Sequence, residues 1–106
     1  QILGIKIVDD TQIVFVDTPG INREQKHAMN RHLNRIASAT LADADLILFM
    51  IDAVSWRGED DMVLDKLKQV NKPVILVINK VDLVKDKADL LPSIAKLKEK
   101  YAFKHI

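Results

Sequence analysis

The apolar positions along the chain form short runs typical of strands and spaced stripes typical of helices. Segments 2–8 and 12–16 are rich in β-branched residues and flank the turn-forming Asp9-Asp10-Thr11, which predicts an antiparallel β-hairpin. The runs at 46–51 and 74–78 contain no polar residue. Because they lack alternation, these runs predict strands buried on both faces, as in a parallel sheet covered by helices.

Three helices are predicted between and after these strands. Acidic residues at 59–61 precede the second apolar stripe, where negative charge suits the positive amino end of a helix. The third helix is predicted from about Pro92 to Tyr101, and segment 103–106 would begin a further strand. The predicted inward positions are Met29, Leu33, Ile36 and Ala37 in the first helix, Val63, Leu67 and Val70 in the second, and Ile94, Leu97 and Tyr101 in the third.

This order of elements predicts an α/β fold, with an open and mostly parallel sheet between helices. Ligands of such sheets bind beyond the carboxyl ends of the strands. The 106 residues suffice for one small domain. No repeat or low-complexity segment points to another architecture.

Composition narrows the partners only slightly. A formal net charge of +1 selects neither nucleic acid nor an anionic membrane. The chain has no cysteine, which excludes a disulfide framework and a thiolate metal site and agrees with a reducing compartment. The longest apolar run is too short to cross a bilayer, and no targeting pattern opens the chain, so we expect a soluble protein.

Asp17-Thr-Pro-Gly20 follows the strand that ends at Val16, at the expected ligand-binding edge. Asp and Gly three residues apart recur often by chance, and a Pro-Gly turn explains the same letters. In the functional interpretation, Asp17 binds a magnesium ion through water, and the amide of Gly20 approaches a terminal phosphate. The position at the sheet edge favours this interpretation.

Asn79-Lys-Val-Asp82 follows the strand that ends at Ile78, and its three fixed letters are a much rarer chance match. Guanine carries two adjacent N–H donors, and one carboxylate accepts from both, whereas adenine would leave the carboxylate of Asp82 unpaired. Lys80 would lay its aliphatic stem over the base. Asn79 would tie the loop to its neighbours and to the base edge. A polar turn that ends a strand is the alternative.

Together the two motifs resemble the third and fourth sequence motifs of the Ras-like P-loop GTPases. Asp17-Thr-Pro-Gly-Ile21 resembles the Era/Der group of the translation-factor class, and segments 55–64 and 87–92 are similar to its Era branch. The resemblance covers the whole chain. It implies a three-layer Ras-like fold with a mostly parallel sheet and an antiparallel hairpin. It also implies a GTPase that acts as a molecular switch in assembly of the small ribosomal subunit.

The resemblance assigns nucleotide contacts to matching positions. Asp17 would support Mg²⁺ through water, and no residue has a certain catalytic role. Ile21 stands where other members carry a water-positioning glutamine, so hydrolysis should be slow unless a partner or a monovalent cation assists it. The implied GTP-binding residues are Asp17, Thr18, Pro19, Gly20, Ile21, Asn79, Lys80, Val81 and Asp82.

The resemblance also implies parts that the 106 residues do not contain. No Gly-x-x-x-x-Gly-Lys-Ser/Thr loop is present, so residues 1–106 are expected to be a partial GTP-binding domain, inactive by itself. The phosphate-binding loop would precede Gln1, and the last base-contacting motif and an RNA-binding KH domain would follow Ile106. The implied partners are GTP, GDP, and the small subunit with its rRNA. A cytoplasmic monomer with peripheral association at the inner membrane is expected.

Other interpretations stay open on the residues alone. The chain could be another Era/Der-group GTPase, a module that keeps the fold without hydrolysis, or a nucleotide-independent domain of receiver or flavodoxin type. Trp56 is expected to pack rather than to anchor a partner. No histidine has companions at metal-ligand spacing. Lys26, His27, Arg31 and Arg35 are expected to form a solvated face of the first helix, with an RNA or partner contact as the alternative. Lys96, Lys98, Lys100 and Lys104 are also expected to be exposed to solvent.

Overall fold

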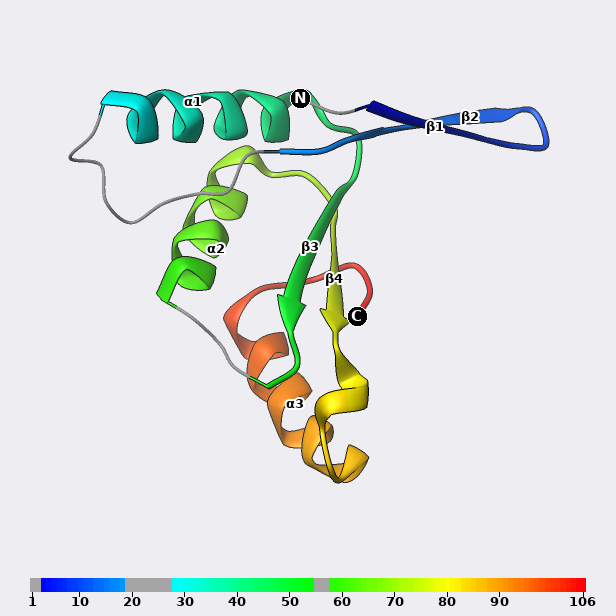
Figure 1. The fold of residues 1–106 in the computed structure, drawn as a ribbon, viewed down its shortest axis with the longest axis vertical. Coiled ribbons are helices and arrows are strands. Elements are labelled where there is room, and N and C mark those ends of the chain that lie inside the picture. Colours follow the sequence, from blue (N-terminus) through cyan, green and yellow to red (C-terminus); the bar gives the residue numbers. More distant parts are fainter. Residues whose placement is uncertain (1–2, 19–27, 55–57) are drawn as a thin grey trace. The chain divides into compact units, whose positions relative to one another are not determined.

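The computed structural model describes residues 3–18, 28–54 and 58–106, which divide into two compact units, Gln1–Asp43 and Ala44–Ile106 (Figure 1). Their order agrees with the predicted order of elements. The first unit contains β1 (Leu3–Val8), β2 (Thr11–Val16) and α1 (Ala28–Asp43). The second contains β3 (Ile47–Asp52), α2 (Gly58–Val70), β4 (Val74–Asn79), the short 3-10 helices η1 (Val81–Leu83) and η2 (Lys87–Asp89), and α3 (Leu90–Lys100).

β1 and β2 form the predicted antiparallel hairpin, with Leu3 opposite Val16 and Val8 opposite Thr11. The turn is shorter than the predicted Asp9-Asp10-Thr11, because Thr11 already pairs with β1. Asp9 opens the turn with a φ of 52°. Tight hairpin turns favour this left-handed conformation, which aspartate tolerates better than most residues.

α1 confirms the helix predicted around Met29 to Ala37 and continues to Asp43. Within its last turns, the hydroxyl of Thr40 donates to the carbonyl oxygen of Ile36 at 2.9 Å. Ala37, one of the predicted inward positions, is buried. The family resemblance also predicts that this helix begins near Asn22, a position that lies outside the described residues.

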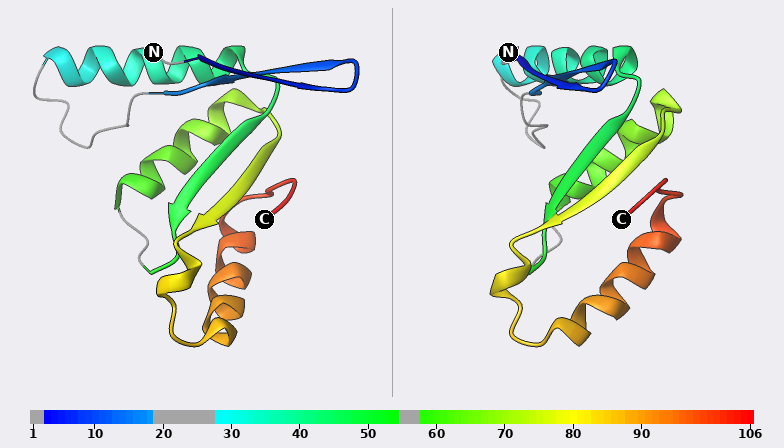
Figure 2. Two further views of the ribbon diagram at one scale, coloured as in Figure 1. Left: turned by 45° about the vertical axis from the view of Figure 1, so that its right-hand side comes forward. Right: turned by 90° about the vertical axis from the view of Figure 1, so that its right-hand side faces the viewer.

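β3 and β4 pair in parallel, as predicted, and run side by side in the views of Figure 2. Their in-register residues Ile47, Phe49, Val74 and Leu76 are buried. The prediction of burial on both faces is wrong for β3, because Leu48 and Met50 are 52% and 60% exposed. A run without polar residues does not tell whether both faces are covered, and no described element of this unit covers the face of Leu48 and Met50.

α2 and α3 supply the rest of this core through the buried side chains of Leu64, Leu67 and Leu97. α2 begins at Gly58, beside the acidic residues expected to mark its start, and ends before Asn71, whose φ is 52°. A residue in this left-handed conformation is a common helix terminator. The chain then re-enters the sheet at Val74, directly alongside Ile47.

α3 starts two residues before the predicted Pro92, which therefore occupies the first turn, where its missing N–H is not needed. Tyr101 was predicted as an inward helix residue. It instead ends the helix in an extended conformation, with its ring centroid 5.0 Å from that of Phe103. Beyond it, His105 forms a parallel bridge with Ile75, so the strand predicted at 103–106 is present as a single bridge beside β4.

Candidate functional site

The carboxyl ends of β3 and β4 meet at one edge of the parallel sheet. The register places Asp52, the last residue of β3, beside Asn79, the last residue of β4. The amide of Ala53 donates to the carbonyl oxygen of Asn79 at 2.9 Å, which continues the pairing beyond both strands. The first residue of the Asn-Lys-x-Asp motif is therefore held by backbone contacts at the edge where α/β sheets bind ligands.

Lys80 turns the chain away from the strand. It has a φ of 62° and a ψ of 35°, the left-handed conformation, and it stands as the N-cap of η1. Its ammonium lies 3.5 Å from a carboxylate oxygen of Asp52, and the two side chains are 53% and 28% exposed. The pair ties the motif lysine to the neighbouring strand, although an ion pair this exposed contributes little stability.

Asp82 lies at the centre of η1, a single 3-10 turn without a buried residue. Two backbone hydrogen bonds of 3.1 Å close the turn, from Leu83 to Lys80 and from Val84 to Val81. Among the described residues, no hydrogen bond or ion pair involves the carboxylate of Asp82. The turn thus presents an exposed carboxylate just beyond the sheet edge.

The other predicted motif, Asp17-Thr-Pro-Gly20, lies only partly within the described residues. Asp17 and Thr18 directly follow β2 and are exposed. Pro19, Gly20 and Ile21 lie outside the described residues. The structure therefore brings Asn79, Lys80, Val81 and Asp82 together with Asp52. It describes Asp17 and Thr18 only within the first unit.

Comparison with known proteins shows the family to which the chain belongs. Residues 1–80 match the family of 50S ribosome-binding GTPases. The chain belongs to this GTPase family. Over its whole length it is 49% identical to GTPase Era of Haemophilus influenzae (strain PittGG) and 46% identical to GTPase Era of Actinobacillus pleuropneumoniae serotype 5b (strain L20). It spans 35% of the length of each of these relatives.

Solved structures agree with that assignment. A crystal structure of Era in complex with MgGDPNP and nucleotides 1506–1542 of 16S ribosomal RNA superposes with a TM-score of 0.85 at 38% identity. An Aquifex aeolicus Era variant bound to GDP and AlF4⁻ superposes with a TM-score of 0.84 at 39% identity. Each match covers 98% of this chain and 36% of the other. The predicted α/β fold of the Ras-like P-loop GTPases is thereby confirmed.

Two residues near the Asn79-Lys-Val-Asp82 motif were not predicted as part of the site. Asp52 ends an apolar run, and the rule that parallel strands align their carboxyl ends could have identified it as a neighbour of Asn79. Lys87 donates to backbone carbonyls on both sides of Asp82. No sequence signal indicates this contact, because a lysine side chain can reach many acceptors and its choice depends on the fold of the loop.

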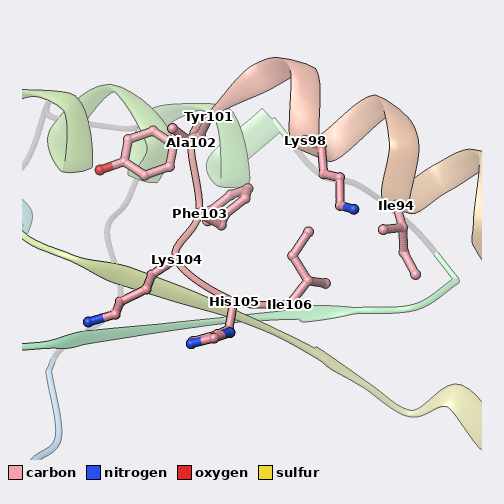
Figure 3. A pocket seen from close by; sticks show the side chains of 8 residues that line it. All are labelled: Ile94, Lys98, Tyr101, Ala102, Phe103, Lys104, His105 and Ile106. Carbon is pink, nitrogen blue, oxygen red and sulfur yellow. The ribbon is translucent and has the colours of Figure 1, made fainter.

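Several other positions singled out in the sequence were expected to be exposed. Lys96, Lys98, Lys100 and Lys104 are exposed as expected, as are Arg31 and Arg35 on α1, whereas Lys26, His27 and Trp56 lie outside the described residues. A hollow of about 460 Å³ lies between α3 and the segment after it, lined by residues such as Ile94, Lys98 and Phe103 (Figure 3). It is near the amino end of β4, where Lys104 pairs with Val74, and thus away from Asn79.

The described part of the chain contains neither a cluster of metal-binding side chains nor a membrane-spanning helix. No group of three or more His, Cys, Asp or Glu side chains is arranged to hold a metal ion among residues 3–18, 28–54 and 58–106. Across the same ranges, no helix combines the length and the apolar character needed to span a membrane.

Proposed function

We propose that these residues are the guanine-recognising part of a GTP-binding domain in a longer GTPase related to Era. The observation that carries the proposal is the exposed Asn79-Lys-Val-Asp82 segment at the carboxyl edge of β3 and β4. A carboxylate displayed on such a turn accepts the N1 and N2 hydrogens of guanine together. Adenine has an acceptor at N1 and no donor at C2, so it would leave the carboxylate unpaired.

The neighbouring motif residues have supporting roles in this proposal. Asn79 is anchored to Ala53 through its backbone, which leaves its side-chain amide to contact the base edge and the adjoining loops. Lys80 places its aliphatic stem over the base while Asp52 holds its ammonium. Val81 sets the backbone that carries Asp82.

Magnesium fits the residues that are present. Mg²⁺ prefers oxygen ligands, and in nucleotide sites it is held by one or two carboxylates, waters and the phosphates rather than by a protein cage. The exposed carboxylate of Asp17 after β2 meets this requirement. We propose that Asp17 supports Mg²⁺ through water and that the amide of Gly20, which lies outside the described residues, approaches the terminal phosphate. The bound ion would neutralise charge on the phosphates during hydrolysis.

For the whole protein we propose slow, Mg²⁺-dependent GTP hydrolysis as a switch in ribosome assembly. The similarity to Era bound to 16S ribosomal RNA, the RNA of the small subunit, supports a small-subunit partner, although the family description names the 50S particle. We favour the small subunit because the whole chain matches Era. An RNA-contacting KH domain, a monovalent cation at the phosphates, a monomeric state and a cytoplasmic location with membrane contact remain predictions from the resemblance.

Nucleotide titration of the intact protein tests this proposal. GDP should raise the melting temperature in the presence of Mg²⁺, because a ligand that binds only the folded state stabilises it, and ADP at the same concentration should not. Added GTP should be converted to GDP and phosphate, and chelation of Mg²⁺ should slow that conversion.

The outcomes separate the remaining alternatives. If GDP and ADP shift the melting temperature equally or not at all, the motif does not recognise guanine and the proposal is wrong. If GDP binds but GTP is not turned over, with or without ribosomal subunits, the protein is a guanine nucleotide-binding module without hydrolysis.

A further inference from the structure

The turn that carries Asp82 has little packing of its own. Val81 and Leu83 are 40% and 57% exposed, and no residue of η1 is buried. The backbone is closed by only two hydrogen bonds of 3.1 Å. A short 3-10 turn with these few contacts is weakly constrained, because its hydrogen-bond geometry is poorer than that of an α-helix. To recognise a base edge, the carboxylate must be held in a defined position, and such a turn alone does not hold it firmly enough.

Lys87 supplies the missing constraint. Its ammonium donates to the carbonyl oxygen of Val81, which also accepts from the amide of Val84, and to the carbonyl oxygen of Val84 at 3.1 Å. One of these carbonyls lies immediately before Asp82 and the other lies two residues after it. A single cation thus bridges the backbone on both sides of the carboxylate, with hydrogen bonds that are stronger than those between neutral groups.

The backbone of Lys87 is itself anchored. It begins η2, which is capped by Asp86, whose carboxylate accepts from the amide of Ala88 at 3.0 Å while its carbonyl accepts from the amide of Asp89 at 3.0 Å. η2 leads directly into α3, which is held in the core by the buried Leu97. The ammonium of Lys87 therefore connects the Asp82 turn to a packed part of the unit.

We propose that Lys87 is a positioning residue for guanine recognition, which holds the Asp82 carboxylate in place through the backbone of Val81 and Val84. This inference rests on the proposed function and deepens it by naming what sets the specificity of that site. Lys87 contacts backbone carbonyls in the described structure, so it constrains the turn without neutralising the carboxylate that meets the base.

The decisive measurement compares GDP with inosine diphosphate (IDP), which lacks the exocyclic amino group of guanine. The ratio of the two dissociation constants reports the contact between Asp82 and that amino group, independently of phosphate and ribose contacts. Lys87→Met keeps most of the length of the side chain and removes its charge and its donors. In the intact protein it should reduce the preference for GDP over IDP about five- to tenfold, since a charged hydrogen bond is lost beside the contact.

Two further variants make the comparison specific. Lys87→Arg retains a cation with several donors and should keep most of the preference for GDP. Lys85→Met removes the same charge two residues away, where the lysine is exposed and has no hydrogen bond or ion pair among the described residues, and it should leave the preference unchanged.

The inference is overturned if Lys87→Met lowers the affinity for GDP and IDP equally, or if Lys85→Met has the same effect as Lys87→Met. Asp86→Ala offers an independent check, because it removes the cap of η2 and keeps Lys87. It should lower the preference in the same direction, and an unchanged preference would count against the inference. If the unmodified protein itself does not prefer GDP to IDP, the proposed guanine site is wrong and the role of Lys87 falls with it.

Discussion

Lys80 and Asp52 form an ion pair across the carboxyl ends of β4 and β3, with 3.5 Å between the lysine Nζ and a carboxylate oxygen. The parallel register explains the contact, because it sets Asp52 beside Asn79, the residue before Lys80. The lysine of the motif is thus oriented by a strand almost thirty positions earlier in the chain. The pair is half-exposed, so it directs the side chain more than it stabilises the fold.

Asp52→Asn in the intact protein should therefore weaken GDP binding only modestly. Exposed ion pairs contribute about 0.2–1 kcal/mol, which corresponds to a change of up to about fivefold in the dissociation constant. The difference from the unmodified protein should shrink at high salt, which screens exposed charges. Calorimetric titration at low and high salt measures both effects.

Asp45→Asn is the matched control, because Asp45 is an exposed acid just before the other end of β3. It should leave the dissociation constant unchanged. A loss of more than about a hundredfold on Asp52→Asn would exceed what an exposed pair supplies and would assign Asp52 a direct contact with the ligand.

Asp82→Asn tests base recognition in the intact protein. Asparagine accepts from N1–H but meets the guanine amino group donor to donor, so the substitution removes one bond and adds a clash. Breaking one side of a buried charged pair costs about 2–5 kcal/mol, which should weaken guanine nucleotides between about thirtyfold and several thousandfold. Xanthine nucleotides should gain affinity, because the oxygen at C2 accepts from the new amide.

The control for that substitution is Asp86→Asn, an aspartate in the same loop whose cap on Ala88 an asparagine can still make. It should not alter the choice of base. Competition against a fluorescent nucleotide measures guanine, xanthine and adenine in parallel. Equal weakening of guanine and xanthine by Asp82→Asn would show that the residue is structural.

Leu67→Ala should destabilise the protein, because the Leu67 side chain is fully buried in the core of the second unit. Large-to-small substitutions at such positions cost about 2–5 kcal/mol in the free energy of unfolding. Leu91→Ala, on α3 at a position 68% exposed, should cost much less. Urea unfolding followed by circular dichroism compares the two, and similar losses would contradict the core as described.

Ile21→Ala should change the affinity for GDP little in the intact protein. In the proposed site this residue replaces a water-positioning glutamine and offers no polar group to the nucleotide. Calorimetry with GDP is the measurement. A loss of GDP affinity beyond about tenfold would mean that the loop after Asp17 contacts the nucleotide differently.

Much of this protein can be predicted from local patterns. β-Branched runs around two aspartates predict the hairpin, and apolar stripes at helical spacing predict the three helices, because these signals depend on neighbours within a few residues. Asn79-Lys-Val-Asp82 predicts a guanine contact for the same reason, since the chemistry lies in consecutive residues. The predicted helix ends were less accurate, because Tyr101 ends the helix in an extended conformation and its ring lies against that of Phe103 at a tilt of 48°.

The tertiary structure decided the contacts between segments that are far apart or linked only by long side chains. The ion pair of Asp52 with Lys80 depends on the register of two strands, and a shift of one residue would separate them. The exposure of Leu48 and Met50 depends on which elements cover the sheet, which an apolar run does not reveal. The two hydrogen bonds of Lys87 depend on how the loop folds back, because its flexible side chain has many acceptors within reach and only packing selects among them.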